Sequence, residues 1–218
     1  MSTTTLSSTH HPIQTPSTGP RFTLPKFGML VFLASEAMLF AGLIGGYIVL
    51  RIAQGPGAWP PPGAPEIGVK LPPTFLNLVM IVNTVILLAS SVTYHWGEVR
   101  MRKGGSGLIG YGLTALFGTI FLGVQAWEWM HLKHEGMWFN SYGIYGSCFF
   151  TMTGFHGLHV FLGLLGILMA VWRAGLRQMK LFSGQTPNPS HTFEELTGYY
   201  WHFVDVVWIF LYSILYVL

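Results

Sequence analysis

Long apolar stretches alternate with short polar segments along this chain, and each apolar stretch is as long as a bilayer is thick. A helix of about 20 residues, rising about 1.5 Å per residue, crosses a hydrocarbon core about 30 Å thick. Apolarity is continuous within each stretch rather than alternating, which predicts helices and not the strands of a barrel. The predicted spans cover roughly residues 27–50, 74–96, 107–130, 144–172 and 198–218.

Two polar segments flank the first predicted span. Residues 1–25 are rich in Ser, Thr, Pro and His and have no apolar periodicity, so we expect a disordered tail. The following linker, GPGAWPPPGAPEIGVKLPP, contains too much Pro and Gly to be helical for long. Residues 26–218 are therefore predicted to form one all-α domain, a five-transmembrane-helix bundle of a polytopic membrane protein.

The composition supports a membrane protein and excludes several other classes. Hydrophobic residues make up 51% of the 218 residues and charged residues only 9%, whereas soluble domains have about 25% charged residues. Cys148 is the single cysteine, so no intrachain disulfide forms. The basic residues lie at the ends of the spans and form no run long enough to bind nucleic acid.

The distribution of Lys and Arg predicts how the chain is oriented. One side of the membrane receives Arg21, Lys26, Arg100, Arg102, Lys103, Arg173, Arg177 and Lys180. The other side receives Arg51, Lys70 and Lys133. Because cytoplasmic segments carry the excess of basic residues, we expect a cytoplasmic N-terminus and tail, with the C-terminus outside.

Three acidic residues, Glu36, Glu128 and Asp205, lie inside predicted spans. An ionised carboxylate near the centre of a membrane helix costs roughly 2.5–3.5 kcal/mol on insertion scales. We therefore expect these side chains to face protein and to have polar partners there.

Residues three apart on a helix share a face, which groups several of these side chains. His156 and His159 share one face of the fourth span, and His202 lies on the same face as Asp205. Gln125 is placed in the same way beside Glu128, and Thr84, Ser91 and His95 form one stripe on the second span.

The topology places Glu36 and the two histidines of the fourth span at similar depth. We hypothesise that Glu36 pairs with a histidine of that span, with His159 as the preferred partner. Small residues such as Gly42, Gly45, Gly46, Gly163 and Gly166 are expected to let helix backbones approach closely.

Three interpretations of the polar residues remain open from their pattern alone. Glu128-x-x-His131 and His156-x-x-His159 invite a metal site, but a di-iron bundle uses two Glu-x-x-His pairs and the chain has one. A proton path is the second interpretation, since chains of Asp, Glu and His relay protons in membranes. The third is a set of structural contacts in which the polar groups satisfy one another.

Several segments resemble subunit III of the haem–copper respiratory oxidases, the cytochrome c oxidase group. The most specific are GIYGSCFFTMTGFHGLHVFLGLLGIL (143–168) and YYWHFVDVVWIFLYSILYVL (199–218). ASEAMLFAGLIGGY (34–47), NTVILLASSVTYHW (83–96) and FLGVQAWEW (121–129) match more weakly and in the same order. The resemblance covers all five spans and indicates the short prokaryotic type, without the first two spans of longer members.

The resemblance assigns family positions to six buried polar residues with an expected structural role. These are Glu36 of the SE-x-M-x-F segment, Glu128 of Q-x-x-E, His156 and His159 of HG-x-H, and His202 and Asp205 of WHF-x-D. It implies no catalytic residue, cofactor or metal on this chain, and places haem and copper in partner subunits.

The resemblance also implies a function and partners. The chain is expected to be a non-catalytic core subunit of a proton-pumping terminal oxidase in aerobic respiratory electron transport. It would stabilise catalytic subunit I, support its proton uptake, contact subunit II and bind structural phospholipids in a bacterial inner membrane. A larger respiratory supercomplex is a further partner to consider. The alternatives are subunit III of a quinol oxidase and, from another class, a stand-alone di-iron or desaturase-like membrane metalloenzyme.

Overall fold

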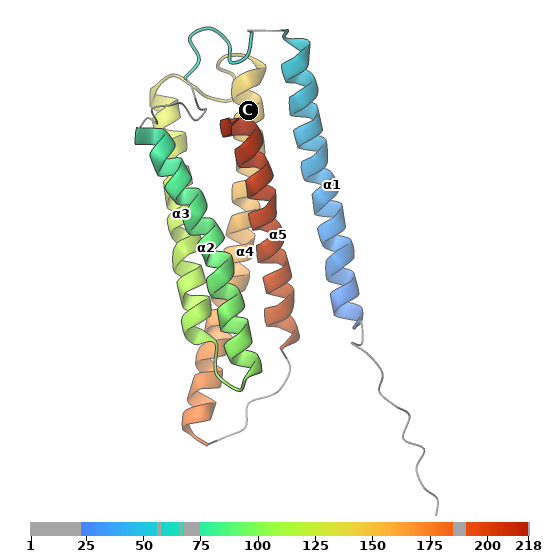
Figure 1. Cartoon of the computed structure of the whole chain (residues 1–218), viewed down its shortest axis with the longest axis vertical. Coiled ribbons are helices and arrows are strands. Elements are labelled where there is room, and N and C mark those ends of the chain that lie inside the picture. Colours follow the sequence, from blue (N-terminus) through green and yellow to red (C-terminus); the bar gives the residue numbers. More distant parts are fainter. Residues whose placement is uncertain (1–22, 56–57, 66, 68–74, 185–190, 218) are drawn as a thin grey trace, which may run out of the picture.

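The computed structural model describes residues 23–55, 58–65, 67, 75–184 and 191–217 and contains long helices with no strand among them. Each helix runs antiparallel to the one before it (Figure 1). Residues 1–22 of the predicted disordered tail lie outside the described residues, whereas Leu24 and Pro25 already belong to the first helix. The elements are α1 (Leu24–Ala53), α2 (Phe75–Arg102), α3 (Leu108–His134), α4 (Ile144–Phe182), α5 (Thr192–Tyr212) and a π-helical turn (Ser213–Val217).

The helices overlap the five predicted spans, and much of the segment 173–197 between the last two spans is helical. Helix α4 continues to Phe182 and α5 begins at Thr192. The extension of α4, RAGLRQMKLF, is rich in strong helix formers, so the helix continues into the polar region. At the start of α5, Glu194 and Glu195 lie in the first turn, where acidic side chains favour a helix N-terminus.

Helices α2, α3, α4 and α5 form the packed part of the bundle, and α1 lies at its side (Figure 1). Helix α1 contacts α5 and α4, and Phe40 and Tyr47 are its only buried side chains. The largest fully buried side chains include Trp201 and Trp208, which extend from α5 into the packed part. The core is therefore centred on α5 and its neighbours, with α1 as a peripheral element.

Small residues permit the closest helix contact, which lies between α2 and α3. A methyl group added to Gly110 would lie 2.4 Å from the Cα atom of Gly97 and 2.8 Å from the carbonyl oxygen of Thr93. Gly118 and Gly163 instead make room for the Trp201 ring. Of the glycines expected from the sequence, Gly163 is therefore tightly packed, whereas Gly97, Gly110 and Gly118 were not among those expected.

The same expectation is wrong for the first helix. An added methyl group would meet no atom within 4 Å at Gly42, Gly45 or Gly46. Because α1 stands at the side of the bundle, its glycines border grooves rather than another backbone.

Replacing Gly110 by Ala should destabilise the protein by about 1–3 kcal/mol, the usual cost of forcing an extra methyl group into a packed core. The measurement is the midpoint of thermal unfolding of the purified protein in detergent. The matched control is Gly112→Ala on the same helix, where an added methyl group meets nothing within 4 Å. Equal midpoints for the two variants would contradict the close contact between α2 and α3.

Candidate functional site: polar contacts between the helices

Glu36 on α1 lies beside His159 on α4, the partner expected from the sequence. Glu36 Oε2 is 3.0 Å from His159 Nε2, and His159 Nδ1 donates to the backbone oxygen of Phe155 at 2.7 Å. Since Nδ1 carries a hydrogen, the contact is either a carboxylate with an imidazolium or a protonated Glu36 that donates to a neutral ring. In both cases one proton lies between Glu36 Oε2 and His159 Nε2.

The Glu36–His159 pair is only partly shielded. His159 is 7% exposed and stacks with Tyr200, while the Glu36 side chain retains 19% exposure. Glu36 was expected to be buried and is instead partly buried, because the peripheral α1 leaves one side of it uncovered.

Glu128 on α3 is fully buried and accepts hydrogen bonds from two side chains. Gln125 Nε2 donates at 2.5 Å, and the Tyr216 hydroxyl lies 2.9 and 3.0 Å from the two carboxylate oxygens. Gln125 was anticipated from its spacing, but Tyr216 was not. Tyr216 belongs to the π-helical turn, whose geometry the apolar pattern does not reveal.

The Glu128-x-x-His131 motif does not form a metal-binding pair. His131 is 41% exposed, stacks on Trp127 and lies 3.2 Å from Glu135, away from the Glu128 contacts. Throughout the described part of the chain, no three or more His, Cys, Asp or Glu side chains gather as metal ligands would.

The two histidines of the HG-x-H segment contact different elements. His156 is 1% exposed, stacks on Trp208 with ring centroids 4.8 Å apart and meets Phe121 edge-on. His159 meets α1 instead, through Glu36. Sharing a helix face therefore does not give these rings a common ligand.

Ser91 joins α2 to α5 through two side chains. Its hydroxyl lies 2.8 Å from His202 Nδ1 and also makes a short hydrogen bond to Asp205 Oδ2. Asp205 is buried as expected, whereas His202 is only partly buried. The sequence placed Ser91 on a polar stripe but did not identify it as the link between His202 and Asp205.

Other members of that stripe have separate roles. Thr84 accepts a hydrogen bond from Trp208 Nε1 at 3.0 Å, and the neighbouring Ser90 accepts one from Trp201 Nε1 at 2.9 Å. The side chain of His95 is 68% exposed and lies 3.9 Å from Glu98.

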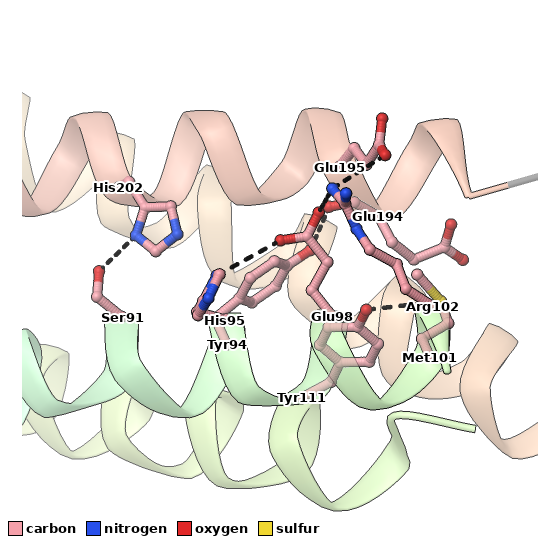
Figure 2. A network of polar contacts seen from close by, with 10 residues as sticks. All are labelled: Ser91, Tyr94, His95, Glu98, Met101, Arg102, Tyr111, Glu194, Glu195 and His202. Atoms are coloured by element: carbon pink, nitrogen blue, oxygen red, sulfur yellow. Dashed lines mark hydrogen bonds and ion pairs between the residues drawn. The ribbon is translucent and has the colours of Figure 1, made fainter. Parts of the chain in front are cut away.

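Charged side chains connect the helices at one end of the bundle (Figure 2). Arg102 on α2 contacts Glu98 at 2.7 Å and Glu195 on α5 at 3.1 Å, and Glu195 also pairs with Lys26 on α1 at 2.6 Å. A second branch joins Arg173 on α4 to Glu194 at 2.8 Å. The sequence indicated that these basic residues orient the chain in the membrane. Two signals could have identified their acidic partners: Glu98 lies four residues before Arg102, and Glu194 and Glu195 lie in the first turn of α5.

The ion pairs of this charged network join residues of α1, α2, α4 and α5. A lone exposed ion pair contributes about 0–1 kcal/mol to stability. The stability that this network provides therefore comes from the linking of several ion pairs and from the burial of their acidic members. Glu98 and Glu194 are buried, and Tyr94 donates to the Glu194 backbone oxygen at 2.6 Å. The network therefore fixes the positions of the helix ends relative to one another.

Together these contacts define a class: a polytopic helical membrane protein whose intramembrane polar groups join its own helices. Among the residues that the structure describes, five helices are long and apolar enough to cross a membrane. Comparison with known sequences gives the family, because the family model described as Cytochrome c oxidase subunit III matches residues 16–218. The chain belongs to the cytochrome c oxidase subunit III family.

Curated relatives agree over almost the whole chain. It is 39% identical to "Cytochrome c oxidase subunit 3" of Synechocystis sp. over 224 residues, covering 100% of this chain and 88% of the relative. It is 40% identical to the protein of the same name from Thermostichus vulcanus over 88% of this chain and 86% of that protein. The Dugong dugon protein is 40% identical over 88% of this chain, and the match covers 68% of its length.

Replacing Tyr216 by Phe should destabilise the protein by about 1–3 kcal/mol, because buried Glu128 then loses one of its two donors. Thermal unfolding of the purified protein measures the change. Tyr212→Phe is the control, since Tyr212 contacts Trp208 and Tyr216 through its ring. If both variants unfold at the same temperature, the Glu128–Tyr216 hydrogen bond does not stabilise the bundle.

Proposed function

We propose that this chain is the non-catalytic core subunit III of a proton-pumping haem–copper oxidase. The observation that carries the proposal is the family match over residues 16–218, which includes all five helices. The names of the curated relatives favour cytochrome c, rather than quinol, as the electron donor of the whole enzyme.

The contacts support an accessory role. Glu36, Glu128 and Asp205 are each engaged by side chains of this chain and do not converge on one point. In this proposal haem and copper belong to subunits I and II, and this chain stabilises subunit I and supports its proton uptake. The six polar residues assigned by the family motifs act as fasteners between helices.

Helix α1 supplies the surface for partners and lipid. Apolar side chains such as Phe32, Met38 and Val49 are exposed along it. A cavity of about 410 Å³ lies between α1 and α4, and one of about 430 Å³ lies between α1 and α5. Both are lined mainly by apolar residues, so phospholipid acyl chains fit them, with subunit I covering adjacent surface.

The charged end of the bundle faces the cytoplasm in this proposal, and the membrane is the bacterial inner membrane. The described basic residues at this end are Lys26, Arg100, Arg102, Lys103, Arg173, Arg177 and Lys180, whereas Arg51 and Lys133 lie towards the other end. This asymmetry follows the positive-inside rule. It also leaves residues 1–22 on the cytoplasmic side.

Replacing Glu36 by Ala should weaken assembly or cause activity to fall progressively during turnover, while the haem spectrum stays unchanged. The variant removes the hydrogen bond between α1 and His159 and leaves the ring contact of His159 with Phe40. Losing such a hydrogen bond costs about 1–3 kcal/mol. The measurements are subunit content after detergent extraction and oxygen consumption followed over many turnovers.

The control for this experiment is Ser35→Ala. Ser35 is exposed on the same helix and bonds to the Phe32 backbone oxygen. Assembly and sustained turnover equal to wild type in Glu36→Ala would remove the proposed role of Glu36.

The orientation gives a separate expected outcome in intact cells. With Cys148 replaced by Ser, a cysteine at Glu135 should react with an impermeant maleimide added outside. A cysteine at Ser183, beyond the other end of α4, should react only after permeabilisation. The reverse pattern would show a cytoplasmic C-terminus.

A further inference from the structure

Ser91 stands between an acid and a histidine that do not bond to each other directly. Its hydroxyl contacts Asp205 Oδ2 on one side and His202 Nδ1, at 2.8 Å, on the other. His202 and Asp205 are three residues apart on α5, and Ser91 reaches them from α2. Because a serine hydroxyl has one hydrogen and accepts others, it can connect the two groups in a single line.

Asp205 is enclosed on every other side. It is 3% exposed, and its second oxygen, Oδ1, has no hydrogen-bond partner among the residues that the structure describes. An ionised carboxylate with so few donors is costly in a buried site. Asp205 therefore gains from holding a proton, and Ser91 is the polar side chain that touches it.

The line of hydrogen bonds has two complete arrangements that differ by one proton. In the first, His202 Nδ1–H donates to Ser91, and the Ser91 hydroxyl donates to ionised Asp205. A proton that arrives at His202 Nε2 is matched by transfer of the Nδ1 proton to Ser91 Oγ and of the Ser91 proton to Asp205. In the second, Asp205 is a neutral acid, His202 is neutral in its other tautomer, and no bond between heavy atoms has changed.

The outer end of this line faces the charged network. The His202 ring nitrogen that does not bond to Ser91 is turned towards the end of the bundle where His95 and Glu98 lie (Figure 2). The Tyr94 ring, beside His95 in sequence, meets the His202 ring edge-on, and the exposed His95 contacts Glu98. His202, which is partly buried, is thus the end of the line that lies nearer the charged network (Figure 2).

On α2, the Tyr94 ring touches His202, but its hydroxyl donates to the Glu194 backbone oxygen. Titratable groups on the other elements packed against α5 have other partners. On α1, Lys26 pairs with Glu195 and Glu36 with His159. On α4, His156 stacks on Trp208. Asp205 therefore connects to the bundle edge through Ser91 and His202.

We propose that Ser91 and His202 form a proton relay that loads and unloads Asp205, which serves as a buried proton-holding site. The relay is open at the charged end of the bundle and closed at Asp205, so it stores a proton and does not conduct one across the membrane. The relay goes beyond the accessory role proposed above. The relay does not depend on that role, because the experiment that tests it measures the protonation of one carboxyl group.

Infrared spectroscopy of the purified oxidase complex tests the relay. The carbonyl stretch of protonated Asp205 is the band that disappears in Asp205→Asn or, if that variant does not assemble, moves in Asp205→Glu. After transfer to D2O, the band shifts as the carboxyl proton of Asp205 exchanges for deuterium. In Ser91→Ala this exchange should be about tenfold or more slower than in wild type, equivalent to about 1.36 kcal/mol in the barrier. Ser91→Thr, which keeps a hydroxyl, should exchange at the wild-type rate.

Ser213→Ala is the matched control, since Ser213 is an exposed serine that bonds to the Ile209 backbone oxygen on the same helix as Asp205. It should exchange like wild type. Wild-type exchange in Ser91→Ala, or exchange in Ser91→Thr as slow as in Ser91→Ala, would overturn the relay. So would the lack of any Asp205 band at every pH at which the complex remains assembled. None of these outcomes depends on oxidase activity or on the partners of the chain.

Discussion

A carboxylate inside a bilayer must find polar partners in the protein, and this requirement joins three pairs of elements in this chain. Glu36 pairs with α4, Asp205 with α2, and Glu128 with the turn that follows α5. Each acidic residue thus selects a partner on an element far away in sequence. Apolar packing alone could not do this, because in lipid an apolar helix face is satisfied equally well by acyl chains.

The spans and one of these pairings were predictable because they depend on length, depth and helical spacing. Glu36 and His159 lie at similar depths in spans with clear boundaries. Few other polar side chains lie at that depth, so the pairing could be predicted. The end of α4 was not predictable in the same way. Hydropathy marks where the bilayer ends, whereas the helix continues through residues 173–182, which are rich in strong helix formers and include Arg173, the partner of Glu194.

The rest of the site depends on how helices rotate against one another, which one sequence does not specify. Ser91 was visible as part of a stripe, but its contact with both His202 and Asp205 requires the crossing geometry of α2 and α5. Tyr216 reaches Glu128 from a π-helical turn, 88 residues away in sequence. The separation of His156 from His159 likewise reflects which neighbours pack on each side of α4.

The peripheral position of α1 has a consequence for biosynthesis. It is synthesised before the other described helices, yet its contacts are with α4 and α5, which leave the ribosome after α2 and α3. Glu36 precedes His159 by 123 residues, a delay of roughly 6 to 25 s at about 5–20 residues per second. During that interval Glu36 has no partner in the membrane. A membrane chaperone or the translocon would then have to shield its carboxyl group from lipid.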